Sequence, residues 1–189
     1  MTANYNWKRF WFSNEEKYST FKGYLTDPDT EYSVNSHLIS DPTYLNEHCI
    51  IMLGEPGSGK SFELREMKNN LEDRLNASKD TLLFIDLRGI GDAVQFENKV
   101  FNNEIIQAWI DSGKNLYLFL DSFDECYLRQ SIIAEIILDK ISKFPLERMY
   151  LYIACRTGNW PVSLGYQLKN CFIQNYKVLN LAILRKVDS

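Results

Sequence analysis

The chain has 189 residues, of which 45% are apolar and 24% are charged, and its formal net charge is −4. This length suits one domain with its own core and excludes two full domains. The acidic balance argues against direct nucleic-acid binding, and the lack of a long apolar run argues against a signal peptide or membrane contact, so we expect a cytoplasmic protein.

Residues 1–45 form a leader that differs in composition from the rest of the chain. Two Asp-Pro steps, Asp27-Pro28 and Asp41-Pro42, favour turns, so we expect short elements joined by loops. The leader is rich in aromatic residues: Tyr5, Trp7, Phe10, Trp11, Phe12, Tyr18, Phe21, Tyr24 and Tyr32. We expect these rings to pack on the edge of the main domain. The alternative is that one of them contacts a bound base.

Residues 46–189 are expected to form the main domain, because short apolar runs alternate there with amphipathic stretches. The pattern predicts strands at residues 49–53, 81–87, 116–120, 149–154 and 174–181, and helices at residues 61–75, 96–110, 128–141 and 163–168. Apolar strands separated by helices indicate a mostly parallel, five-stranded sheet with helices on both faces, which is a three-layer α/β fold. Ligands of such sheets bind at the carboxyl ends of the strands.

The first strand leads into Gly54-Glu55-Pro56-Gly57-Ser58-Gly59-Lys60-Ser61, a phosphate loop of the form G-x-x-x-x-G-K-[ST], followed by a helix. Its glycines let successive backbone N–H groups converge on phosphate oxygens, and the helix presents its N-terminus to the same anion. Lys60 is expected to reach the β- and γ-phosphates, and the Ser61 hydroxyl to ligate Mg²⁺. The predicted nucleotide contacts are Glu55, Pro56, Gly57, Ser58, Gly59, Lys60, Ser61 and Phe62.

The third strand runs into the acidic segment Asp121-Ser122-Phe123-Asp124-Glu125. A carboxylate at the end of a strand can help to hold the magnesium ion of a bound nucleotide, and we assign that role to Asp121. Glu125 is the first candidate for orienting and deprotonating an attacking water molecule, and Asp124 is the alternative. Acidic turns after strands are common, so this interpretation depends on the neighbouring phosphate loop.

The fourth strand ends at Arg156. If that strand lies beside the strand of the phosphate loop, Arg156 points toward the γ-phosphate, where it could sense the nucleotide or stabilise transition-state charge. The alternative is an arginine paired with a surface carboxylate. Arg88 also follows a strand, and for it a solvated or ion-paired surface role is favoured.

In this order, the motifs resemble those of a NACHT-type ATPase of the STAND class, a family of P-loop NTPases. The resemblance rests on GEPGSGKS at 54–61, LFLDSFDE at 118–125 and CRT at 155–157. Residues 179–188 resemble the family's lead into its helical domain, although Ile183 stands where proline is common. The resemblance implies an ATP-dependent switch: ADP holds the resting state, exchange for ATP permits self-association, and slow hydrolysis resets it.

The leader also resembles the segment before the NACHT core of large bacterial antiviral STAND proteins, through Arg9-Phe10-Trp11, Gly23-Tyr24-Leu25 and Asp27-Pro28. Such relatives recognise phage proteins as triggers. The family pattern continues into helical and winged-helix domains that this sequence does not contain, so we expect either a piece of a larger protein or a natural short relative.

Two other functions stay open. The chain could be a different P-loop enzyme, such as a small kinase or a loader ATPase, although no arginine cluster of the kind found in a kinase lid is evident. It could also be an interaction module that binds nucleotide without turnover. A guanine signature N-K-x-D is absent from the sequence, and adenine is favoured mainly through the family resemblance.

Overall fold

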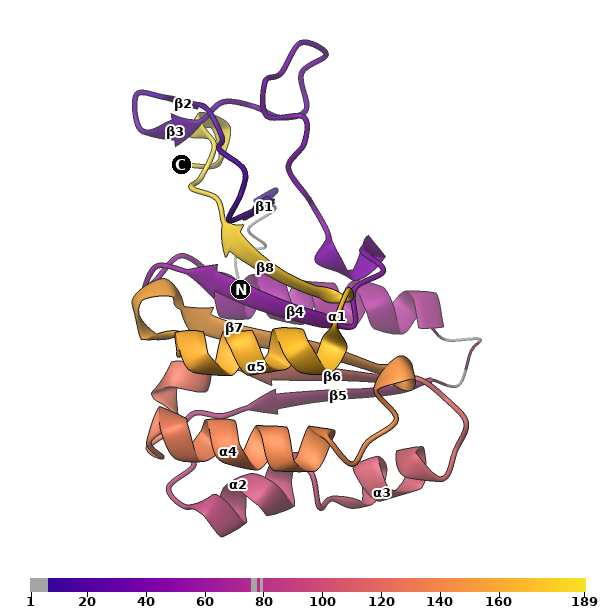
Figure 1. The fold of residues 1–189 in the computed structure, drawn as a ribbon. Coiled ribbons are helices and arrows are strands. Elements are labelled where there is room, and N and C mark those ends of the chain that lie inside the picture. Colours follow the sequence, from indigo (N-terminus) through magenta and orange to yellow (C-terminus); the bar gives the residue numbers. More distant parts are fainter. Residues whose placement is uncertain (1–6, 76–77, 79) are drawn as a thin grey trace, which may run out of the picture.

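The computed structural model describes residues 7–75, 78 and 80–189. Its strands are β1 (Trp11–Ser13), β2 (Thr20–Phe21), β3 (Tyr24–Leu25), β4 (Cys49–Gly54), β5 (Thr81–Asp86), β6 (Leu116–Asp121), β7 (Met149–Arg156) and β8 (Tyr176–Leu181). Its α-helices are α1 (Lys60–Leu75), α2 (Ala93–Val100), α3 (Glu104–Ile110), α4 (Gln130–Ile141) and α5 (Val162–Phe172). Figure 1 shows the main sheet and its helices as a layered body, with β2 and β3 above it.

The main sheet has six strands in the order β1-β8-β4-β7-β6-β5. The five predicted strands are all present and pair in parallel. The sixth strand was not predicted: the leader contributes β1, which pairs antiparallel with β8 and places Trp11 opposite Leu181. Trp11 is completely buried, and burial of so large an apolar side chain stabilises this short strand.

The strands alternate their side chains between two buried layers, as β4 illustrates. Cys49 and Ile51 belong to the core beneath α2, α3, α4 and α5, whereas Ile50 and Met52 belong to the core beneath α1. Figure 1 shows α1 behind the sheet and α4 and α5 in front of it. The predicted three-layer α/β fold with helices on both faces is therefore confirmed.

The helices differ from expectation in two places. The single helix predicted at 96–110 is in fact two, α2 and α3, because the Asn103 side chain accepts a hydrogen bond from the Ile106 N–H and begins a new helix there. The short helix predicted at 163–168 is longer and reaches Phe172, with Ile173 after it at φ 43°.

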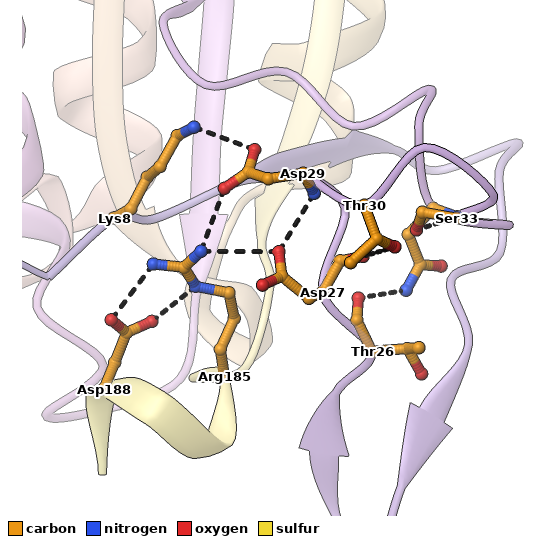
Figure 2. Close-up of polar contacts among 9 residues, drawn as sticks. Lys8, Thr26, Asp27, Asp29, Thr30, Ser33, Arg185 and Asp188 are labelled. Carbon is orange, nitrogen blue, oxygen red and sulfur yellow. Dashed lines mark hydrogen bonds and ion pairs between the residues drawn. The ribbon is translucent and has the colours of Figure 1, made fainter.

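A network of charged side chains joins the leader to the segment after β8 (Figure 2). Arg185 donates to Asp188 at 2.7 and 3.1 Å and to Asp29 at 2.9 Å, and a longer bond reaches Asp27 at 3.4 Å. Lys8 forms an ion pair with Asp29 at 2.8 Å. Both ends of the described chain therefore lie at the same end of the sheet. Within the described ranges, no helix has the length and apolar character needed to cross a membrane.

Candidate nucleotide-binding site

A pocket of about 270 Å³ lies at the carboxyl ends of the parallel strands. It is lined by Pro56, Gly57, Ser58, Gly59, Lys60, Ser61, Phe62, Asp121, Ser122, Asp124, Glu125, Ala154 and Arg156. The fold thus brings together every predicted site residue except Glu55, which is outside the lining formed by the described residues. Ser122 and Ala154 were not predicted, because neither residue type carries a sequence signal for phosphate or metal binding.

The phosphate loop (residues 54–61) connects β4 to α1 across the floor of this pocket. Gly57 and Gly59 have φ values of 71° and 92°, a backbone conformation that glycine adopts without a steric penalty. At Gly54 the requirement is space, because an added Cβ would lie 3.0 Å from Ser58 Oγ and 3.1 Å from Lys60 Cδ. The loop therefore curves tightly around the start of α1, whose first two residues line the pocket.

Lys60 folds back over the loop. Its Nζ donates to the backbone carbonyl of Gly54 at 2.7 Å and to that of Glu55 at 3.0 Å. Burial lowers the pKa of Lys60, an effect that the nearby Asp124 carboxylate opposes. Glu55 contributes a carbonyl oxygen to this arrangement, and its side chain is exposed. The ammonium is thus held at the pocket by bonds that a phosphate could replace.

Asp121 lies at the end of β6, next to Ser61 in the pocket lining. The Ser61 hydroxyl donates to Asp121 Oδ1 at 2.9 Å. Asp121 is 1% exposed, and its Oδ2 has no hydrogen-bond partner among the described residues, although Arg65 Nη2 lies 3.8 Å away. Burial raises the pKa of Asp121, and the Ser61 hydrogen bond partly offsets that effect. An unsatisfied, buried carboxylate oxygen beside a hydroxyl suits a divalent cation.

The protein side chains alone do not form a complete metal cage. Within the described parts of the chain, no three His, Cys, Asp or Glu side chains gather in a way that could hold a metal ion. In nucleotide sites Mg²⁺ is bound through one or two protein groups together with phosphate oxygens and water. Ser61 and Asp121 fit that requirement.

Asp124 and Glu125 both pair with Arg156, but in different surroundings. The Asp124 side chain is 3% exposed and accepts from the Arg156 backbone N–H at 3.1 Å, from the Asn159 amide at 3.0 Å and from Arg156 Nε at 3.2 Å. The Glu125 side chain is 37% exposed and accepts from Arg156 Nη2 at 2.6 Å. Both side chains line the pocket. Asp124 is bound to three groups at the end of β7 and holds that end in place, whereas Glu125 is bound to Arg156 alone among the contacts described and can change partners.

Arg156 meets the condition set by the sequence, because β7 lies beside β4 and Arg156 stands opposite Gly54 in the parallel register. Its guanidinium lines the pocket while it contacts both carboxylates. Arg88 forms an ion pair with Asp86, the residue that ends β5, and it lies outside the pocket lining within the described chain.

Ser122 is the least expected residue of the site. It separates Asp121 from the turn Phe123–Glu125 and adopts φ 57° and ψ 43°, which is left-handed backbone on a residue other than glycine. Such backbone is uncommon and is found at sites whose surroundings enforce it. The conformation turns the chain so that Asp121 and Glu125 both line the same pocket.

No protein-family model matches the sequence, and no curated protein matches it. A solved structure of C. elegans PCH-2 is similar, with a TM-score of 0.43 and 16% sequence identity. The similarity covers 78% of this chain and 38% of that chain, so this chain spans well under half of the PCH-2 chain.

Proposed function

We propose that this chain binds ATP or ADP with Mg²⁺ at the phosphate loop and hydrolyses ATP slowly. One observation carries the proposal: the loop residues Lys60 and Ser61, the buried carboxylate of Asp121, and the Glu125–Arg156 pair converge on one pocket from three neighbouring strand ends. Phosphate, cation and attacking water each require one of these groups. Phe62 lines the same pocket beside the loop, and we assign the nucleoside to that side.

In this proposal, Lys60 exchanges its bonds to the Gly54 and Glu55 carbonyls for phosphate oxygens. Ser61 and Asp121 hold Mg²⁺, which when bound supplies positive charge that polarises and neutralises the phosphates. Glu125 orients a water molecule and accepts its proton. Arg156 moves from Glu125 toward the transferring phosphoryl group, where it stabilises charge and frees the carboxylate.

The finer proposal is that the site belongs to the switch core of a NACHT-like STAND protein. It is supported by the order of the three motifs, and by the position of β7, with its terminal Arg156, between β4 and β6. On this proposal the core acts within a larger assembly that self-associates in response to a trigger, for which a phage protein is the candidate. Adenine specificity, the ADP-bound resting state and a cytoplasmic location belong to the same proposal.

A second function, nucleotide binding without turnover, is favoured by the Glu125–Arg156 ion pair at 2.6 Å. A carboxylate that stays bound to its arginine cannot take a proton from water efficiently. Measured release of inorganic phosphate separates the two functions, since both predict binding and the first alone predicts turnover.

Nucleotide binding is tested by thermal unfolding of the purified chain with Mg²⁺ and ADP, ATP or GTP, beside the Lys60→Ala variant. Ligand at about a hundred times its dissociation constant adds roughly 2.7 kcal/mol of stability, which for a domain of this size is a rise of roughly 5–10 °C. We expect that rise with adenine nucleotides in the wild type and its loss in Lys60→Ala. An equal rise in the wild type and in Lys60→Ala would show that the nucleotide does not bind at the phosphate loop.

A further inference from the structure

Arg9 is a buried arginine that the leader carries to the back of the phosphate loop. It is 6% exposed and lies two residues before β1. Its place is fixed by its neighbours, because the Phe10 carbonyl accepts a hydrogen bond from the Ala182 N–H at 2.9 Å and Trp11 is completely buried in the sheet. The guanidinium therefore reaches the loop from a backbone segment that is held in place by these contacts.

The guanidinium of Arg9 bridges two backbone carbonyls from distant parts of the chain. Nη1 donates to the Ser58 carbonyl at 2.7 Å, and Nη2 donates to the Ala182 carbonyl at 2.8 Å. Both bonds are charge-assisted, and the planar fork of arginine fixes the angle between them. A lysine could not reproduce this geometry.

The Ser58 carbonyl belongs to the same peptide unit as the Gly59 N–H. Because a peptide bond is planar and trans, this oxygen and this N–H point in opposite directions. Gly59 lines the pocket, whereas Arg9 lies outside the lining formed by the described residues. A carbonyl held outward by Arg9 therefore directs the Gly59 N–H toward the space where a phosphate would bind.

The Ser58–Gly59 peptide needs to be held in one orientation because it precedes a glycine. Gly59 has φ 92°, and an added Cβ would meet Arg9 Nη1 at 3.4 Å. A peptide next to glycine rotates more freely than one between residues with side chains, so a free loop would populate orientations with the N–H turned away. The charge on Arg9 also polarises the peptide unit, which strengthens its N–H as a donor.

We propose that Arg9 is a positioning residue of the phosphate loop: it orients the Ser58–Gly59 peptide so that the Gly59 N–H donates to the nucleotide phosphates. This inference rests on the proposed nucleotide site. Arg9 does not touch the nucleotide, and its effect passes through the one peptide unit that it holds.

The test needs a control for the structural contribution of a buried arginine. Arg185 provides it, since its side chain is 12% exposed and its bonds to Asp29 and Asp27 also join the leader to the segment after β8 (Figure 2). Among the described residues, the hydrogen bonds and ion pairs of Arg185 go to these two aspartates and to Asp188, and not to the phosphate loop. Arg9→Met and Arg185→Met thus both weaken this attachment, and only Arg9→Met releases the Ser58 carbonyl.

Binding of MgADP is measured by titration calorimetry in the wild type, Arg9→Met, Arg9→Lys, Arg185→Met and Lys60→Ala, at a temperature where circular dichroism shows each to be folded. We expect Arg9→Met to weaken binding about tenfold or more, as loss of a charged hydrogen bond does. Arg9→Lys should recover part of that loss, and Arg185→Met should stay within about threefold of the wild type. The Gly59 amide resonance, followed by NMR without nucleotide, should move in Arg9→Met and stay in place in Arg185→Met.

Wild-type affinity in Arg9→Met would overturn the inference, and so would equal weakening in Arg9→Met and Arg185→Met with an unmoved Gly59 amide. Failure of the proposed function is a separate result, because then the wild type itself does not bind MgADP. In that case the NMR resonance of the Gly59 amide, measured without nucleotide, alone tests whether Arg9 orients the peptide. If this resonance is the same in the wild type and in Arg9→Met, the inference is wrong.

Discussion

At the level of single residues, the two carboxylates after β6 take different roles because they are buried differently. Asp124 receives hydrogen bonds from the backbone and side chain of the β7 exit, and its side chain is 3% exposed. Glu125 borders the pocket with a more exposed side chain. The sequence left the choice between them open, since two adjacent acidic residues after a strand have the same local pattern. Their contacts with the neighbouring strand end favour Glu125 as the base.

We predict that Glu125→Gln leaves MgATP binding largely intact and lowers the hydrolysis rate by about 10²-fold or more, the usual effect of removing a general base. Asp124→Asn should instead lower the unfolding free energy by roughly 1–3 kcal/mol, because one of the two buried acceptor oxygens becomes an amide donor and the charge paired with Arg156 is lost. Phosphate release and chemical denaturation of both variants check this pair. Wild-type turnover in Glu125→Gln would show that the catalytic carboxylate is assigned wrongly.

Glu63, in the first turn of α1, should make the stability of the fold depend on pH. Burial raises the pKa of Glu63 from 4.5 to about 7, and the positive charge of Arg9 opposes that rise. Between these two values the folded protein holds a proton that the unfolded chain has lost, so stability falls as pH rises through this window and stays lower above it.

Glu63→Gln should therefore stabilise the Mg²⁺-free and nucleotide-free protein at pH 8, on the order of 1–3 kcal/mol after allowance for solvent screening. The gain should shrink as the pH approaches 4.5. Urea denaturation across this range measures it, and Asp73→Asn, at an exposed position of the same helix, controls for the loss of one negative charge. A gain independent of pH would rule out the titration of Glu63 as its cause.

At the level of elements, the segment between β5 and β6 departs most from expectation. Apolar residues from Phe96 to Ile110 recur at roughly helical spacing, which predicted one helix. The break depends on Asn103, whose side chain caps α3 by accepting from the Ile106 N–H at 3.0 Å. An asparagine in the middle of an amphipathic pattern can be an interior residue or a cap, and the pattern alone does not distinguish the two.

We expect Asn103→Ala to lower the unfolding free energy by about 1 kcal/mol, since alanine cannot accept the bond that begins α3. Asn103→Asp should keep most of the stability, because a carboxylate accepts the same bond and suits a helix N-terminus. Asn102→Ala, a substitution at the exposed neighbouring position, serves as the control. Thermal unfolding of the three variants measures the effect, and equal midpoints for Asn102→Ala and Asn103→Ala would contradict the capping role.

For the whole molecule, the alternation of apolar strands and amphipathic helices was enough to predict the parallel sheet, its two covered faces and the strand end at which the pocket lies. The phosphate loop was predictable because its spacing fixes both chemistry and local geometry. The strand in the leader was not predictable from the sequence, because β1 has only three residues and its partner β8 lies at the other end of the sequence. The contact of Arg9 with the phosphate loop was unpredictable for the same reason, because both of its acceptors are backbone carbonyls far along the chain.

The pairing of β1 with β8 also sets the order of events as the protein is made. Arg9 and Ala182 are separated by 173 positions, and contacts of such long range form late in folding because a large loop must close first. During synthesis β1 leaves the ribosome before β8 does. It has no strand to pair with until almost all of the described residues have been made. Until Ala182 is synthesised, Arg9 lacks its second hydrogen-bond acceptor, so a nascent chain completes the support of its phosphate loop only after that residue has been added.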